Sequence, residues 1–286
     1  MQIALFLLWI TSPCAPPTAA PADERFSVRL TVYDQITQPG ETIPLQAKLE
    51  HPGIWAMHLH MRGYPLRFTM PGIFDQEVKT AEEATATVHW QVRANRPAIY
   101  WLQVSFAGSA HHQPARSVSG VYVWPRDSRI LITDIDHTIS NLSELMVPFT
   151  TNQATPPLAG AVETLRQLAG SYGIIYLTAR DEILYERTRA WLIEKGFPAG
   201  PLVCRDFHVG GTQGGFKRQF IGELKKRFPN IAVGVGDQVS DAHAYLKNGL
   251  KAFLIEPRET GIPKEAIVVH SWQEVRQQLA KDLYGR

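Results

Sequence analysis

Two aspartates, Asp134 and Asp136, stand one residue apart directly after the apolar run RILIT. Two carboxylates this close repel each other, and one of them keeps a proton unless a cation neutralises the pair. Two more aspartates, Asp237 and Asp241, follow a second apolar run, IAVGVG. Carboxylate oxygens are hard ligands and suit Mg²⁺. The spacing therefore predicts a magnesium site built from these four aspartates.

Mg²⁺ held by carboxylates typically serves phosphate chemistry. A carboxylate such as Asp134 can attack phosphorus and form an aspartyl phosphate. A second acid, Asp136, can protonate the leaving oxygen and later activate water. The hydroxyl of Thr178, after the run GIIYL, can bind a phosphoryl oxygen, and Lys217, in GGFKRQF, can neutralise the charge on the phosphoryl group. Lys225 and Lys226 are alternatives to Lys217.

The second half of the chain, residues 128–286, alternates apolar runs with helical stretches. Near-continuous apolar strands separated by helices indicate a parallel sheet covered on both faces. In such sheets, ligands bind beyond the carboxyl ends of the strands. Asp134, Thr178 and Asp237 each end an apolar run. We therefore expect an α/β domain of Rossmann type that brings these three side chains to one edge.

Residues 23–125 follow a different pattern, in which apolar and polar residues alternate with a period of two. The runs FSVRLTVY, TIPLQAKLE and ATATVHWQV show it, and Pro-Gly pairs such as Pro39-Gly40 and Pro71-Gly72 separate the runs. Several short alternating strands in about 100 residues indicate an all-β sandwich of antiparallel strands. We expect an immunoglobulin-like accessory domain here.

Residues 1–22 combine a short apolar run, ending near Ile10, with small residues and the sequence Ala20-Pro21-Ala22. The run is far shorter than the ~20 residues that span a bilayer, and the small residues are typical of a signal-peptide cleavage site. We expect export to the periplasm or the exterior; the alternative is a disordered tail. The formal charge is only +2, and no basic stripe alternates with aromatic residues. We therefore expect no nucleic-acid partner.

The segments DIDHT, YLTAR, FK and GDQVSD occur in this order within residues 130–257. They resemble the four motifs of the haloacid dehalogenase (HAD) superfamily phosphatases. The resemblance implies that Asp134 is the nucleophile and Asp136 the general acid and base. It makes Thr178 the threonine of motif two and Lys217 the lysine of motif three. The Mg²⁺ ligands that it implies are Asp134, the Asp136 carbonyl, Asp237 and Asp241. Thr138 and Arg180 are candidates for substrate binding, and a structural role for Arg180 is the alternative.

DIDHTI, IIYLTARDE and GFKRQFIGELKKRFP further resemble the lipin-like and actin-patch-associated phosphatidate phosphatases, although His137 stands where those enzymes usually have glycine. The segments between the motifs are too short for a large cap. The expected function is a Mg²⁺-dependent phosphatase acting on phosphatidate or a similar phospholipid, with peripheral membrane contact. The basic residues that could approach anionic lipid are Lys217, Arg218, Lys225, Lys226 and Arg227. The alternatives are a soluble phosphomonoesterase for nucleotides or sugar phosphates, and a phospholipid-binding protein without catalysis.

Overall fold

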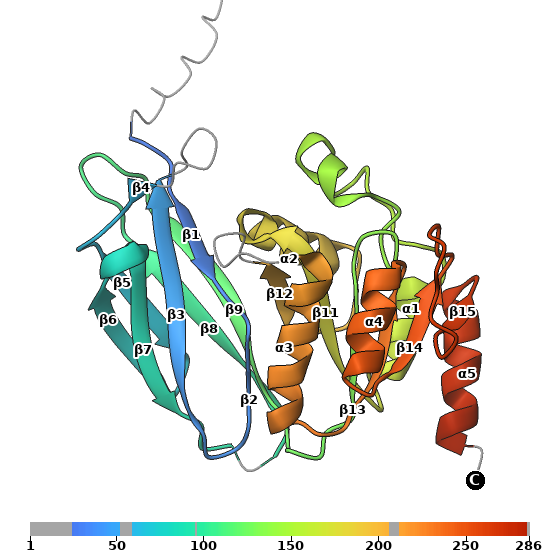
Figure 1. Ribbon diagram of the computed structural model, residues 1–286. Helices are drawn as coiled ribbons and strands as arrows, with labels where there is room; N and C mark the ends of the chain where they lie inside the picture. The colour runs from blue at the N-terminus through green and yellow to red at the C-terminus, as the bar shows by residue number, and fades with distance from the viewer. Residues whose placement is uncertain (1–24, 52–58, 95, 206–211, 285–286) are drawn as a thin grey trace, which may run out of the picture.

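The computed structural model describes residues 25–51, 59–94, 96–205 and 212–284, and the predicted signal peptide at 1–22 lies outside these ranges. Two β-sheets form from the first half of the chain, and a third sheet flanked by helices forms from the second half (Figure 1). Among the described residues, no helix is both long and apolar enough to cross a membrane.

The two sheets of the first half pack face to face around one apolar core. Alternate side chains of both sheets point into it, such as Leu45 and Val88 from one and Phe68 and Val104 from the other. The first sheet contains β1 (Arg29–Val32), β3 (Thr42–His51), β4 (Leu59–His60) and β7 (Thr85–Gln91). The second has the order β2 (Gln35–Thr37), β9 (Ala115–Val123), β8 (Ala98–Phe106), β5 (Pro65–Met70) and β6 (Phe74–Lys79).

One strand pair departs from the antiparallel arrangement that the alternation suggested. β2 runs parallel to β9, because the chain leaves the first sheet after β1 and crosses to the second at Tyr33 and Asp34. A period of two shows which face of a strand is buried but carries no information on the direction of its neighbour. The immunoglobulin-like assignment stays a prediction.

The sheet of the second half is parallel throughout and has the order β12-β11-β10-β13-β14-β15, as the apolar runs predicted. Its strands are β10 (Ile130–Thr133), β11 (Gly173–Asp181), β12 (Leu202–Arg205), β13 (Ile231–Gly236), β14 (Lys251–Ile255) and β15 (Ile267–Val269). The helices are α1 (Ala161–Leu168), α2 (Tyr185–Glu194), α3 (Gln213–Arg227), α4 (Val239–Lys247) and α5 (Trp272–Tyr284). Short 3₁₀ turns are η1 (Glu82–Ala84), η2 (Glu144–Phe149) and η3 (Glu182–Leu184).

Helices cover both faces of this sheet, and the central strand β10 is fully buried. Leu131 packs with α1, α2 and α5 on one face, whereas Ile130 and Ile132 pack with α3 and α4 on the other. From β10 the strand order proceeds to β11 and β12 on one side and then returns to β13 on the other. The carboxyl ends of β10 and β13 therefore form the switch point where ligands bind in such sheets.

The two halves of the chain meet through a buried carboxylate on the crossover between β1 and β2. Asp34 accepts hydrogen bonds from the backbone N–H of Gly120 at 2.7 Å and from that of Leu202 at 3.0 Å. Its own N–H donates to the Tyr185 hydroxyl at 2.7 Å. Gly120 belongs to β9, whereas Leu202 and Tyr185 begin β12 and α2. One side chain thus joins the β-sandwich to the edge of the parallel sheet.

Replacing this carboxylate is expected to destabilise the protein. Asp34→Ala leaves two buried N–H groups without their acceptor and removes the charge facing Arg189 Nε at 3.6 Å. Each unsatisfied buried group costs about 1–3 kcal/mol, so the free energy of unfolding is expected to fall by about 2–4 kcal/mol. The control Lys226→Ala breaks an exposed ion pair with Glu223. We expect it to change the free energy of unfolding by less than about 0.5 kcal/mol. Equal urea midpoints for the two variants would contradict this role of Asp34.

Candidate active site

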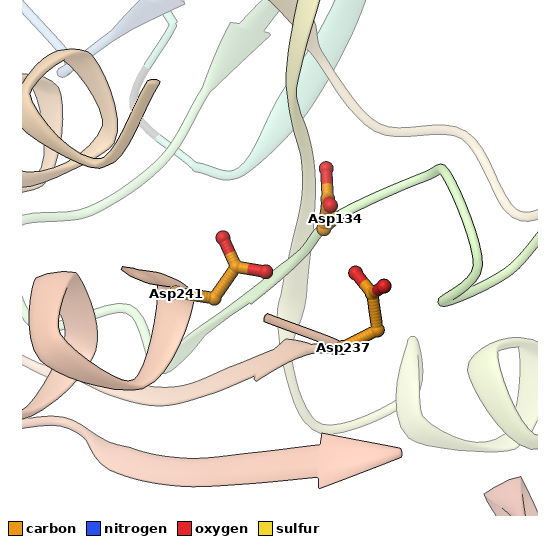
Figure 2. Close-up of side chains that lie close together, drawn as sticks. All are labelled: Asp134, Asp237 and Asp241. Carbon is orange, nitrogen blue, oxygen red and sulfur yellow. The ribbon is translucent and has the colours of Figure 1, made fainter. Parts of the chain in front are cut away.

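Three of the predicted aspartates come together at the switch point. Asp134 follows β10, Asp237 follows β13, and Asp241 lies in the first turn of α4. Each offers a carboxylate oxygen, and these oxygens all lie within 4.8 Å of one another. Figure 2 shows the three side chains around one small space. Asp134 and Asp241 are almost fully buried, so their charges are held away from bulk water.

Asp241 reaches this cluster because Gly236 leaves room for it. A Cβ atom built on Gly236 would lie 2.5 Å from Asp241 Oδ2 and 2.6 Å from its Cβ, closer than a Cβ atom approaches a non-bonded neighbour. The Asp241 carboxylate also accepts the backbone N–H of Gln238 at 3.2 Å and so caps the first turn of α4. The sequence GDQVSD thus places one aspartate at the strand end and a second one turn into the helix.

Lys217 lies against the same carboxylates. Its Nζ is 2.7 Å from Asp241 Oδ1 and 2.9 Å from Asp134 Oδ1, and the side chain is buried. The alternative lysines lie elsewhere, because Lys225 donates to the carbonyl of Asn248 and Lys226 pairs with Glu223 on the surface. Of the five basic residues that were expected to approach anionic lipid, Lys217 is therefore not on the surface, because the carboxylates of Asp134 and Asp241 hold it inside the site.

Two of the carboxylates, those of Asp134 and Asp237, have a raised pKa. Burial raises the pKa of Asp134 to about 8; Lys217 opposes the shift, while Asp241 and Asp136 add to it. Burial, followed by the charge of Asp241, raises the pKa of Asp237 to about 7, against the opposing charge of Lys217. Although burial alone would lower the pKa of Lys217, Asp134 and Asp241 raise it above its ordinary value. One ammonium group thus faces an excess of carboxylates.

This arrangement fits a divalent cation. Among the described residues, Asp134 Oδ1 has no aligned hydrogen-bond donor, although it is buried and lies near Lys217. A buried carboxylate oxygen without a donor is costly, and a metal ion would satisfy it. Asp134, Asp237 and Asp241 would hold Mg²⁺, and the carboxylate of Asp136 would not, because Arg180 binds both of its oxygens. Asp136 would then contribute only its carbonyl, as the resemblance implies.

Asp136, Thr178 and Arg180 form a second group beside the cluster. Arg180 donates to Asp136 through Nε at 2.9 Å and Nη2 at 2.8 Å. Thr178 Oγ1 accepts the backbone N–H of Arg180 at 3.2 Å. β11 does not end at Thr178, as its apolar run suggested, but continues to Asp181, and its pairing with β12 is irregular between Leu177 and Asp181. The predicted substrate contact of Arg180 stays a prediction, whereas its contact with Asp136 is observed.

Thr138 lies on the turn that follows Asp136. Its hydroxyl is 3.5 Å from Asp237 Oδ1 and its side chain is buried. Its carbonyl accepts a hydrogen bond of 2.7 Å from Nε1 of Trp272, the first residue of α5. Trp272 thus supports the loop that carries Asp134 and Asp136, a role that sequence reasoning missed.

His137 adopts a backbone conformation that explains why glycine suits this position. Its φ angle is +53°, in the left-handed region that glycine adopts freely, histidine adopts at modest cost and β-branched residues avoid. We expect His137→Gly to change the free energy of unfolding by less than about 1 kcal/mol, and His137→Val to lower it by about 1–2 kcal/mol, with His137→Ala between them. Thermal unfolding of the three variants tests this order. Equal stability of the valine and glycine variants would contradict it.

The second half of the chain is thus a parallel α/β sheet with three aspartates and a buried lysine at its switch point. Residues 131–255 match the family described as the LNS2 domain of PITM 1-3, over less than half of the chain.

Three known proteins illustrate the similarity. A Bacillus cereus protein, provisionally described as a nucleotidase, is 41% identical over 73 residues, which are 25% of this chain and 36% of that protein. The structure of the L-2-haloacid dehalogenase PA0810 matches 54% of this chain and 100% of its own, with 13% identity and a TM-score of 0.42. The structure of the HAD-hydrolase YfnB of Bacillus subtilis, solved with magnesium, matches 54% of this chain and 99% of its own, with 13% identity and a TM-score of 0.40.

Proposed function

We propose that this protein is a Mg²⁺-dependent phosphatase that transfers a phosphoryl group first to Asp134 and then to water. The observation that carries the proposal is the buried cluster of Asp134, Asp237, Asp241 and Lys217 at the switch point of the sheet. Three carboxylates with oxygens within 4.8 Å of one another and an ammonium group at 2.7–2.9 Å from two of them support a role in phosphoryl transfer.

In the first step, an oxygen of Asp134 attacks phosphorus while the bond from phosphorus to the leaving oxygen breaks. Asp136 gives its proton to that oxygen, so the product leaves as an alcohol. Asp136 then takes a proton from water, the water oxygen attacks phosphorus, and the bond to Asp134 breaks to release phosphate. Lys217 stays protonated and balances the charge of Asp134 and of the phosphoryl group. Bound Mg²⁺ supplies further positive charge to the phosphoryl oxygens.

For the substrate, we propose phosphatidate or a similar phospholipid. The match of residues 131–255 to the LNS2 family and the resemblance of the motifs to lipin-like enzymes support this class. Between β10 and α1, the described residues hold the 3₁₀ turn η2, which rises above the sheet in Figure 1. Its Phe149 is 82% exposed and its Met146 is also exposed. Apolar side chains near the site favour peripheral contact with a membrane.

A soluble phosphomonoesterase is the second candidate, because the Bacillus cereus relative is provisionally described as a nucleotidase. A lipid-binding protein without catalysis is a weaker alternative, since a pure sensor needs neither a nucleophile at Asp134 nor a proton donor at Asp136. We further propose, from the sequence of residues 1–22, that the protein acts outside the cytoplasm.

Phosphate release by the purified protein tests the proposal. The substrates are phosphatidate in detergent micelles, a soluble aryl phosphate and a nucleoside monophosphate, each with Mg²⁺ or with EDTA. We expect release that requires Mg²⁺ and is fastest with phosphatidate. Faster release from a soluble substrate would favour the second candidate. No release from any of them, with phosphatidate binding intact, would overturn the phosphatase proposal in favour of the sensor.

A further inference from the structure

We infer that Arg180 is a positioning residue, which fixes the carboxyl group of Asp136 for proton transfer and does not bind the phosphoryl group. The inference rests on the proposed function, because it assumes that Asp136 protonates the leaving oxygen. It assigns Arg180 a role different from the substrate contact that the sequence suggested.

The contact between the two side chains is bidentate. Nε of Arg180 donates to Asp136 Oδ2 at 2.9 Å, and Nη2 donates to Oδ1 at 2.8 Å. Two parallel hydrogen bonds fix the plane of the carboxyl group as well as its distance. The Asp136 side chain is 13% exposed, whereas that of Arg180 is 3% exposed. Arg180 therefore supports Asp136 from the protein interior, and Asp136 is the more accessible of the two to a substrate.

Arg180 is itself held from two further directions. Nη1 donates to Thr188 Oγ1 at 3.1 Å, and Thr188 is a fully buried residue of α2. The backbone N–H of Arg180 is bound to Thr178 Oγ1, on the same strand. Turning the guanidinium away from Asp136 and Thr188 would break three hydrogen bonds of a buried side chain. These contacts favour a structural role in which Arg180 stays in place and holds the carboxyl group of Asp136 in one orientation.

A positioning role predicts which kinetic constant changes. Proton transfer requires the carboxyl group within hydrogen-bond reach of the leaving oxygen, and it contributes about 10²–10⁴-fold to a rate. Loss of its orientation lowers kcat but leaves substrate binding, and hence KM, nearly unchanged. In the first step, measured as release of the alcohol in a single turnover, the loss should also depend on the leaving group, because an alkoxide needs the proton whereas a dinitrophenolate leaves without it. Hydrolysis of the aspartyl phosphate also uses Asp136 and is common to both substrates, so it should slow equally for the two. A residue that binds the phosphoryl group affects both substrates equally.

The experiment compares Arg180→Gln, Arg180→Lys and Thr188→Val with the unchanged protein and with Asp136→Asn, on an alkyl phosphate and on 2,4-dinitrophenyl phosphate. We expect Arg180→Gln to lower the single-turnover rate of alcohol release about 100-fold for the alkyl phosphate and less than about 5-fold for the dinitrophenyl ester, with substrate affinity nearly unchanged. Arg180→Lys should restore little, since an ammonium group cannot form the bidentate contact. Thr188→Val, a milder change that keeps the arginine, should show the same leaving-group pattern with a smaller loss.

The double variant Asp136→Asn with Arg180→Gln should be no slower than Asp136→Asn alone, because both changes remove the same proton transfer. Equal losses on the two esters with a raised KM, or additive losses in the double variant, would overturn the inference and make Arg180 a phosphate contact. An unchanged protein inactive on both esters would instead overturn the proposed function and, with it, the basis of this inference.

Discussion

Asp134→Asn is expected to lower the rate of phosphate release by about 10⁴-fold, the largest loss of activity among the single changes considered. The amide has the shape of the carboxyl group, but it is a poor nucleophile and cannot form the aspartyl phosphate. It also replaces the carboxyl oxygen that lies 2.9 Å from Lys217 Nζ with an amide group, which cannot carry a negative charge. Steady-state release from the preferred substrate at saturating Mg²⁺ measures the loss. A pre-steady-state experiment with substrate in excess should show no burst of released alcohol.

The matched control is Asp127→Asn, which makes the same chemical change at an exposed position before β10. It should leave the rate within about 2-fold of the unchanged protein, since its side chain lies on the surface. Circular dichroism should show that both variants are folded, because the asparagine at position 134 introduces no additional volume into the buried cluster. A folded Asp134→Asn variant with more than a tenth of the original rate would exclude Asp134 as the nucleophile.

The sequence predicted the parts of this site that depend on strand ends. Asp134 and Asp237 could be placed together because buried parallel strands are recognisable as apolar runs and their carboxyl ends share one edge. Asp241 could be added because it follows Asp237 by one helical turn. Lys217 could be named only beside Lys225 and Lys226, since a single sequence does not show which face of α3 meets the sheet.

Contacts between distant elements could not be predicted in the same way. The bond from Trp272 to the carbonyl of Thr138 joins α5 to the loop after β10, and no local pattern connects residues 134 positions apart. The pairing of Arg180 with Asp136 depends on an irregular part of β11, where the apolar run had already ended. Local periodicity identifies elements and their buried faces, whereas such long-range polar bonds depend on how the elements pack.

The stability of the metal-free protein is expected to fall as the pH rises from about 5 to about 8. Burial, with the charges of neighbouring aspartates and against that of Lys217, raises the pKa of Asp134 to about 8 and that of Asp237 to about 7, whereas the unfolded chain ionises both near the ordinary value of 3.8. In this window the folded state binds protons that the unfolded state has released. The stability therefore decreases with rising pH, and the loss is complete above about pH 8. We expect it to be on the order of a few kcal/mol.

Mg²⁺ should reverse this loss, since a cation favours the ionised carboxylates that burial disfavours. At about 100 times its dissociation constant, Mg²⁺ would add about 2.7 kcal/mol to the free energy of unfolding, and this gain should be larger at pH 8 than at pH 5. Urea unfolding at several pH values, with EDTA or with Mg²⁺, measures both effects.

Other buried acids, such as Asp34 and Glu186, also have a raised pKa, so the informative quantity is the difference between the unchanged protein and Asp237→Asn. Asp237→Asn removes one of the two carboxyl groups whose raised pKa is given above, so the pH dependence in EDTA should become shallower. It should also weaken the stabilisation by Mg²⁺, because a ligand is lost. If the two proteins show the same pH slope and the same response to Mg²⁺, the carboxylates do not form one metal site. A shallower pH slope with an unchanged response to Mg²⁺ would show that Asp237 contributes to the pH dependence but would exclude Asp237 as a metal ligand.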